Sequence, residues 1–105
     1  MINRIVLMGN TTRDAEVKKV GDKTVCDFTI AVNHAKDMPA SFFRVSAWDK
    51  WTAEHPPKKG DKVIVDGSLR LREFEKKDGS TGFSAEIRAD RVTVTSVKAP
   101  DEVDF

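Results

Sequence analysis

The sequence predicts an all-β protein, built as a five-stranded antiparallel barrel with a short helical insert between the third and fourth strands. Segments rich in β-branched and aromatic residues recur along the chain, and Gly, Pro, Asn and Asp separate them. Only one stretch has helical character. At 105 residues the chain is long enough for a single core, and a small closed or nearly closed barrel suits several short strands of this kind.

The first part of the chain predicts three β segments. Residues 2–8 are rich in β-branched side chains and end at a Gly-Asn turn signal. A short segment over residues 15–20 ends at a Gly-Asp pair. Residues 24–33 form the clearest strand, because Phe28 and Ile30 share one face and the smaller Thr and Ala residues between them take the other.

The middle of the chain predicts a strand followed by the helical insert. After a polar loop, residues 42–48 alternate in character as a strand does. Residues 49–55 can form one or two helical turns, with Asp49 as the N-cap, and the Pro-Pro pair at 56–57 ends them. Trp51 in this insert is interpreted as a core residue.

The last part predicts a long hairpin and a tail. Residues 62–74 form a long strand with Gly67 where a barrel strand would bend. A turn at residues 77–80 leads into the last strand, residues 83–97. The predicted domain organisation is a barrel domain over residues 1–98 and an acidic tail over residues 99–105.

Composition indicates a folded, water-soluble chain and limits its chemistry. Charged residues make up 33% and hydrophobic residues 39% of the sequence. The longest apolar run is four residues, 5–8, too short for a membrane span or a secretory signal. Cys26 is the single cysteine, which fits a reducing cytosol, and with only two His residues a structural zinc site is not expected. We therefore expect a cytoplasmic protein without cofactors.

Charge is distributed unevenly along the chain. The formal net charge is +1, yet three acids, Asp101, Glu102 and Asp104, lie in the last five residues. The rest of the chain therefore carries an excess of about four positive charges. A mildly basic body is compatible with a nucleic-acid partner, although mixed charge is also ordinary for a soluble surface.

Sorting two strands by alternation predicts a binding face. Val63, Val65, Leu69 and Leu71 take the core side of the 62–74 strand, as Phe43, Val45 and Ala47 do in the strand before it. The opposite faces of both strands mix Arg with aromatic residues: Phe42, Arg44 and Trp48 on one, Arg70, Arg72 and Phe74 on the other. Aromatic rings stack unpaired bases, and Arg binds the phosphates between them.

Other interpretations of the same residues stay open. Trp48 and Phe74 can instead be half-buried packing residues or part of a subunit interface. Arg70 and Arg72 can be ordinary solvated strand charges. Lys76, beside the predicted hairpin turn, can guide phosphates or simply be a surface lysine.

Several segments, in this order, resemble the bacterial and phage single-stranded DNA-binding proteins. The segments are residues 1–10 (MINRIVLMGN), 12–16 (TRDAE), 28–33 (FTIAVN), 43–48 (FRVSAW), 59–61 (KGD) and 65–72 (VDGSLRLR). The resemblance implies an OB-fold barrel that binds single-stranded DNA without sequence preference in DNA replication, recombination and repair. It adds Arg13 and Lys50 to the predicted DNA-binding residues.

The resemblance also has departures and implied partners. Three of the family's stacking positions match Phe42, Trp48 and Phe74, whereas the fourth falls near Ala35 and has no aromatic residue. The family implies a homotetramer, or a dimer in smaller relatives. It also implies that replication and repair proteins bind the tail, here Asp101, Glu102, Asp104 and Phe105, although a frayed terminus is the alternative.

No enzyme motif competes with a binding function. The chain has no His-Glu-x-x-His or phosphate-loop pattern, and neither Cys26 nor any serine lies in a nucleophile motif. Two rival binding functions remain. One is a primosome-type OB protein that acts mainly through protein contacts, and the other is an RNA binder similar to cold-shock proteins.

Overall fold

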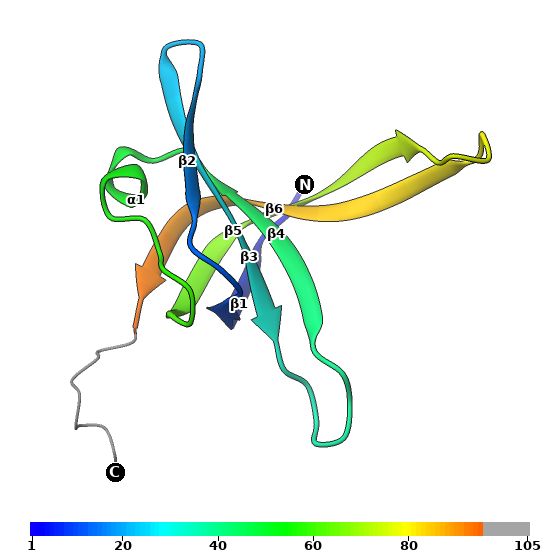
Figure 1. The fold of residues 1–105 in the computed structure, drawn as a ribbon, viewed down its shortest axis with the longest axis horizontal. Helices are drawn as coiled ribbons and strands as arrows, with labels where there is room; N and C mark the ends of the chain where they lie inside the picture. Colours follow the sequence, from blue (N-terminus) through cyan, green and yellow to red (C-terminus); the bar gives the residue numbers. More distant parts are fainter. Residues whose placement is uncertain (96–105) are drawn as a thin grey trace.

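A single sheet that closes into a ring forms the body of the protein (Figure 1). The structure is a computed structural model, and it describes residues 1–95. The elements are β1 (Ile5–Thr11), β2 (Glu16–Val20), β3 (Lys23–Val32), β4 (Ser41–Ala47), α1 (Lys50–Glu54), β5 (Lys62–Glu75) and β6 (Thr81–Val94). The predicted barrel with a short helix is therefore confirmed. The segment predicted at residues 15–20 supplies an additional strand, β2. The tail and its predicted boundary at residue 98 lie outside the described residues.

The strand order is β1-β5-β6-β4-β3-β2, and β1 closes the ring by also pairing with β3. Neighbouring strands are antiparallel except β4 and β6, which run parallel. The parallel pair follows from topology, because the chain leaves β4 through α1 and reaches β6 only after β5. It places residues 44–47 beside residues 86–89, a contact on which the predicted binding face depends.

Alternate side chains of the barrel strands make up the core. Val45, Val63, Val65, Ile30 and Ile87 are all at most 2% exposed. Burial of such side chains contributes roughly 1.5–3 kcal/mol each. Because successive residues of a strand point to opposite sides, the residues between them face outward.

Gly67 lies where the backbones of β5 and β6 approach each other closely. A Cβ atom at this position would lie 2.0 Å from the carbonyl oxygen of Arg88 and 2.8 Å from the Cα of Ala89. The pairing register shifts by one residue here, because Asp66 faces Arg91 and Gly67 faces Ala89. The bend predicted at Gly67 is thus a close backbone approach beside a β-bulge.

Helix α1 packs against β3. Asp49 is its N-cap, as predicted, and its carboxylate accepts hydrogen bonds from both the backbone N–H and the buried hydroxyl of Thr52. Trp51 was expected in the core, but this expectation is wrong: the side chain is 53% exposed and stacks on His55, with ring centroids 4.4 Å apart. In so short a helix, Thr52 takes the buried position and Trp51 faces outward.

Three arms extend from the barrel in Figure 1: the β2–β3 hairpin, the loop between β3 and β4, and the β5–β6 hairpin. In the β5–β6 hairpin, the prediction that Leu69 and Leu71 belong to the core is wrong, because these side chains are 38% and 68% exposed. They do lie on the same side of β5 as Val63 and Val65. The strand simply continues beyond the barrel, where no second layer covers that side.

Candidate nucleic-acid interface

The outer face of β4 carries the residues that alternation predicted. Phe42 and Arg44 are exposed, whereas Val45 and Ala47 are buried. Phe43, on the inner side, packs against the core. The two sides of this strand are therefore assigned as the sequence indicated, with one side supporting the barrel and the other presented to solvent.

Strand register joins the outer sides of four strands into one face. Arg44 of β4 lies between Thr29 of β3 and Glu86 of β6, and Glu86 in turn lies opposite Arg70 of β5. Directly paired residues point to the same side of a sheet. The arginines predicted from separate strands thus share a continuous surface, hereafter the outer face of β3, β4, β6 and β5.

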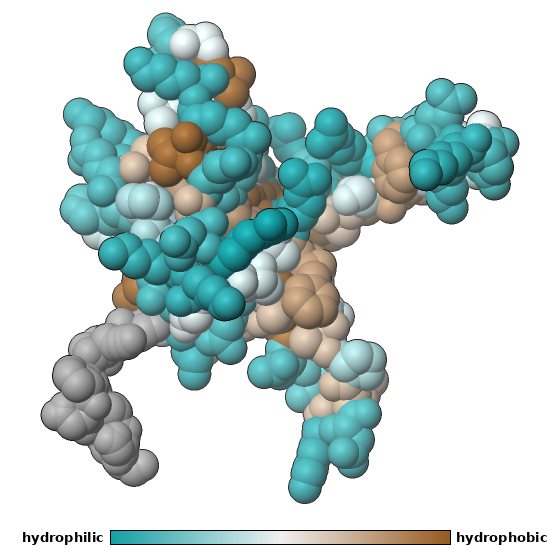
Figure 2. Space-filling model, viewed as in Figure 1, coloured by the Kyte–Doolittle hydropathy of each residue, from teal (hydrophilic) through white to brown (hydrophobic). Residues whose placement is uncertain are grey.

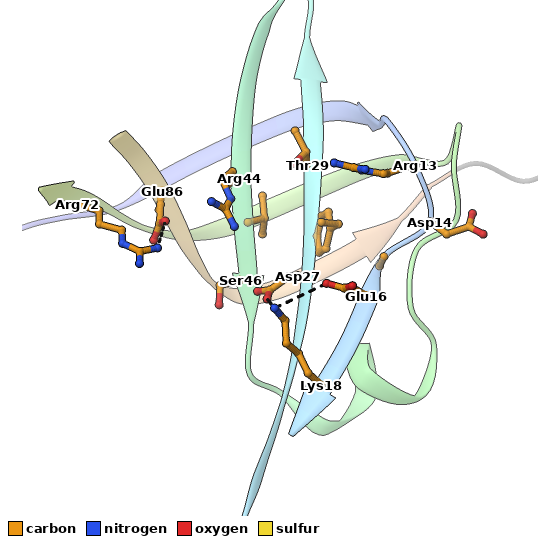
Figure 3. Close-up of a pocket in the computed structure, with 13 residues that line it drawn as sticks. Arg13, Asp14, Glu16, Lys18, Asp27, Thr29, Arg44, Ser46, Arg72 and Glu86 are labelled. Carbon is orange, nitrogen blue, oxygen red and sulfur yellow. Dashed lines mark hydrogen bonds and ion pairs between the residues drawn. The ribbon is translucent and has the colours of Figure 1, made fainter. Parts of the chain in front are cut away.

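A hollow of about 860 Å³ lies on this face, between the β1–β2 connection and the base of the β5–β6 hairpin. Arg13, Arg44 and Arg72 line it from three different segments, as Figure 3 shows. Its remaining charged lining comes from Lys18 and the acids Asp14, Glu16, Asp27 and Glu86. The hollow is thus polar and of mixed charge, with basic groups placed along its length.

Ion pairs neutralise some cations of the outer face and leave others available. Arg72 lies 3.4 Å from the Glu86 carboxylate, and Lys18 lies 3.3 Å from Asp27 and 3.7 Å from Glu16 (Figure 3). Within residues 1–95, Arg13, Arg44 and Arg70 form no such pair. Three guanidinium groups are therefore available to an incoming anion.

Aromatic side chains border the charged region. Phe42 is 65% exposed and Phe74 is 46% exposed. Phe74 lies opposite Gly82, and a Cβ at Gly82 would come within 2.7 Å of the Phe74 ring. The glycine thus leaves room for the ring to lie flat across the hairpin, an arrangement typical of paired Gly and aromatic residues in sheets.

Trp48 follows β4 directly and is half-buried. The guanidinium of Arg88 lies over its ring, 5.1 Å from the ring centroid. This distance is within the range of a cation–π interaction. Arg88 is a residue of this face that the sequence interpretation did not select.

Of the nine predicted DNA-binding residues, three line the hollow, Arg13, Arg44 and Arg72, and Lys50 and Lys76 are among the six that do not. Lys50 is in the first turn of α1 and faces Glu54 at 3.9 Å. Lys76 lies at the far end of the β5–β6 hairpin, where its backbone N–H donates to the carbonyl of Ser80. Neither lines the hollow. Figure 2 shows that this far end is mostly hydrophilic, with a more hydrophobic patch just behind it.

The position of the missing aromatic residue is a loop between β3 and β4. Ala35 lies there, and the neighbouring His34 is hydrogen-bonded through Nε2 to the hydroxyl of Ser41 at 2.6 Å. The loop therefore offers this face no aromatic ring from the Ala35 position.

The sequence interpretation missed Glu86 and Arg88, which reach the face from β6. Alternation along residues 83–97 places both residues on the same side as Ser84, so the sequence pattern alone could have grouped them. Their relevance depends on the parallel β4–β6 pairing, which links residues far apart in the chain. Phe83, 62% exposed, was missed too, and it lies on the opposite side of the hairpin.

The remaining titratable groups described in the structure include one buried thiol and no metal-binding cluster. Residues 1–95 contain no cluster of His, Cys, Asp or Glu that could hold a metal ion. Cys26 is buried under the face, and burial, together with the nearby Asp27 and Asp49 carboxylates, raises the pKa of its thiol to about 11. In the described part of the chain, no helix is long and apolar enough to cross a membrane.

Comparison with known proteins links this geometry to one family. The model of the single-strand binding protein family matches residues 2–95. A single-stranded DNA-binding protein of Oceanobacillus iheyensis is 36% identical over 93% of this chain and 66% of its own length. A single-stranded DNA-binding protein of Bifidobacterium longum is 36% identical, and the match covers 84% of this chain and 46% of that protein. A Staphylococcus aureus relative is 32% identical, and the match covers 97% of this chain and 70% of that protein. The chain thus spans about half to two thirds of these relatives.

A solved structure resembles the fold. The small single-stranded DNA-binding protein from Streptomyces coelicolor superposes with a TM-score of 0.75, covering 90% of this chain and 95% of that one. Sequence identity between the two is 23%. At that level the likeness supports the barrel architecture and leaves the binding residues to be argued from this chain.

Proposed function

Since a family model covers residues 2–95, this chain belongs to the single-strand binding protein family, and we propose that it binds single-stranded DNA on the outer face of β3, β4, β6 and β5. The observation that carries the proposal is that arginines without an ion pair within residues 1–95 share this face with exposed aromatic rings. The function is binding and protection of single strands in replication, recombination and repair, not catalysis.

Base stacking and phosphate contacts divide the work of binding. Phe42, Trp48 and Phe74 stack bases, which contributes roughly 1–3 kcal/mol per stacked base. Arg13, Arg44, Arg70 and Arg72 bind the intervening phosphates, with Lys50 and Lys76 as peripheral cations. Stacking accepts every base, so the proposed binding has little sequence preference.

The test is a comparison of single-stranded and duplex DNA. We expect a labelled dT oligonucleotide to bind tightly in fluorescence anisotropy and a duplex of equal length to bind far more weakly, because paired bases hide their π-faces. Affinity should fall as salt rises, since bound arginines release counterions from the phosphates. Equal or tighter binding to the duplex would refute the proposed function.

We propose further that residues 1–98 are the DNA-binding domain and residues 99–105 a partner-binding tail. The acids Asp101, Glu102 and Asp104 and the terminal Phe105 suit a partner with a basic pocket and an apolar slot. Deleting residues 101–105 should leave DNA affinity unchanged or slightly higher, because competing negative charge is removed. It should abolish capture of replication and repair proteins in pull-downs, and unchanged capture would contradict the role of the tail.

We also propose self-association, as a homotetramer or a dimer. Val6 and Met8 on β1 are 54% and 51% exposed, and Met8 lies opposite Ile64 of β5, which makes an apolar strip. Introducing a charge into the strip with Met8→Glu should lower the mass measured by sedimentation equilibrium. Met38→Glu, at a 60% exposed loop position, is the matched control and should leave the mass unchanged. A wild-type monomer at micromolar concentration would refute self-association.

The proposed location of the protein is the cytoplasm, where it is bound to DNA.

A further inference from the structure

Arg88 and Trp48 form a pair that the proposed DNA contacts do not yet explain. The guanidinium lies 5.1 Å from the centroid of the indole ring. It therefore covers one face of the ring, and a base can stack only on what remains open. A cation held at an aromatic stacking residue can serve a nucleotide in two ways at once, through the ring and through the phosphate.

The pair is held in place by backbone geometry. Arg88 lies directly opposite Ser46 on β4, two residues before Trp48, so its side chain and the indole emerge on the same side of the sheet. On its other edge, the backbone of Arg88 is in close contact with Gly67 of β5, where even a methyl group would collide with the Arg88 carbonyl. The strand carrying Arg88 is thus fixed from both edges.

The charge of Arg88 is not neutralised by a carboxylate. Across residues 1–95 it forms no ion pair and no side-chain hydrogen bond, whereas Arg72 on the same face is paired with Glu86. Within residues 1–95, the contact with the indole ring therefore leaves the five N–H donors of the guanidinium without a protein acceptor. Those donors remain available to a phosphate.

From these observations we propose that Trp48 and Arg88 form one nucleotide subsite, in which a base stacks on the part of the half-buried Trp48 ring that Arg88 leaves exposed and Arg88 binds the adjoining phosphate. Arg88 is in addition a positioning residue, because its planar guanidinium restricts rotation of the indole. The inference rests on the proposed function and names a residue and a pairing specific to this chain. A lysine would keep the charge without the flat contact on the ring.

The experiment makes Trp48 the only fluorescent reporter. Trp51, exposed and stacked on His55 away from the pair, is replaced in a Trp51→Phe parent, and a dT oligonucleotide is titrated while tryptophan emission is followed. The parent should bind and its emission should be quenched. Adding Arg88→Ala should weaken binding roughly 5- to 20-fold at low salt and reduce quenching. It should also make the slope of log affinity against log salt shallower by about 0.7–1, the change for one lost phosphate contact.

Two further variants separate the subsite from a structural role. Arg88→Lys should restore the salt slope but not the full quenching, since charge returns without the planar contact. Arg91→Ala removes an exposed arginine from the same strand, opposite Asp66, and should change neither readout. Melting temperatures of all variants are compared with the parent to exclude loss of the fold.

The outcomes distinguish the subsite from the proposed function. If the parent binds but Arg88→Ala leaves the salt slope unchanged, or behaves as Arg91→Ala does, the subsite is refuted and the proposed function stands. Tighter binding by Arg88→Ala would also refute it, because the guanidinium would then be shielding the ring from bases. If neither wild type nor parent binds the oligonucleotide, the proposed function fails and the subsite fails with it.

Discussion

Replacing Glu86 with Gln should tighten binding to single-stranded DNA. The Glu86 carboxylate is 3.4 Å from Arg72 and directly opposite both Arg44 and Arg70 in the sheet. It is therefore the acid placed among the arginines that are proposed to hold phosphates. The substitution keeps the size of the side chain and one acceptor oxygen while removing one negative charge from the face.

The size of the effect follows from Coulomb repulsion. A phosphate bound to Arg72 would lie roughly 6 Å from the Glu86 carboxylate, where two unit charges repel by roughly 0.7 kcal/mol at a dielectric constant of about 80 and roughly 1.4 kcal/mol at about 40. This corresponds to about 3- to 10-fold tighter binding at low salt. Fold stability should barely change, because the Arg72 side chain is 64% exposed and such ion pairs contribute little.

Fluorescence anisotropy of a labelled dT oligonucleotide at about 50 mM and 200 mM salt measures the effect, which should shrink at the higher salt as screening increases. Glu73→Gln is the matched control. Glu73 lies on the same hairpin opposite Phe83, on the other side of the strands, so its removal changes net charge equally without touching the face. Unchanged or weaker binding by Glu86→Gln, or equal tightening by Glu73→Gln, would refute the placement of the phosphates.

Three further predictions test the scaffold beneath the face. Gly67→Ala should lower the free energy of unfolding by about 1–3 kcal/mol or more in urea denaturation, because the new Cβ meets the Arg88 carbonyl; the neighbouring Ser68→Ala should cost far less. Asp49→Ala should lower the free energy of unfolding by about 0.5–2 kcal/mol in the same assay, because the helix cap and the partner of the buried Thr52 hydroxyl are lost together. An unchanged denaturation midpoint would contradict this prediction. The Cys26 thiol, whose pKa is raised to about 11, stays protonated in the folded state while an unfolded thiol ionises above about pH 8.5. Unfolding free energy should therefore fall from that pH toward pH 11, and Cys26→Ala should flatten this decline.

Much of the proposed binding face could be predicted because strand alternation is a local property. Phe42 and Arg44 on one side, and Val45 and Ala47 on the other, follow from the two-residue period of β4 alone. The cap at Asp49 is equally local, since it depends only on the residues of the following turn. These features needed no knowledge of which strands become neighbours.

Features that depend on long-range register could not be predicted in the same way. The Arg72–Glu86 ion pair and the Arg88–Trp48 contact require the pairing of β6 with both β5 and β4. Exposure of Leu71 requires knowing where the barrel ends along β5, because alternation assigns a side but not what covers it. The outward orientation of Trp51 likewise depends on how α1 sits on the barrel.

Two phenylalanines on the β5–β6 hairpin allow the most direct test of which surface binds DNA. Phe74 is 46% exposed on the side shared with Arg70 and Arg72, and Phe83 is 62% exposed on the opposite side. Measured by anisotropy with a dT oligonucleotide, Phe74→Ala should weaken binding by roughly 1–3 kcal/mol, the value of one stacked base, and Phe83→Ala should leave it nearly unchanged. The reverse order, or equal losses from both variants, would contradict the assignment of single-stranded DNA to the outer face of β3, β4, β6 and β5.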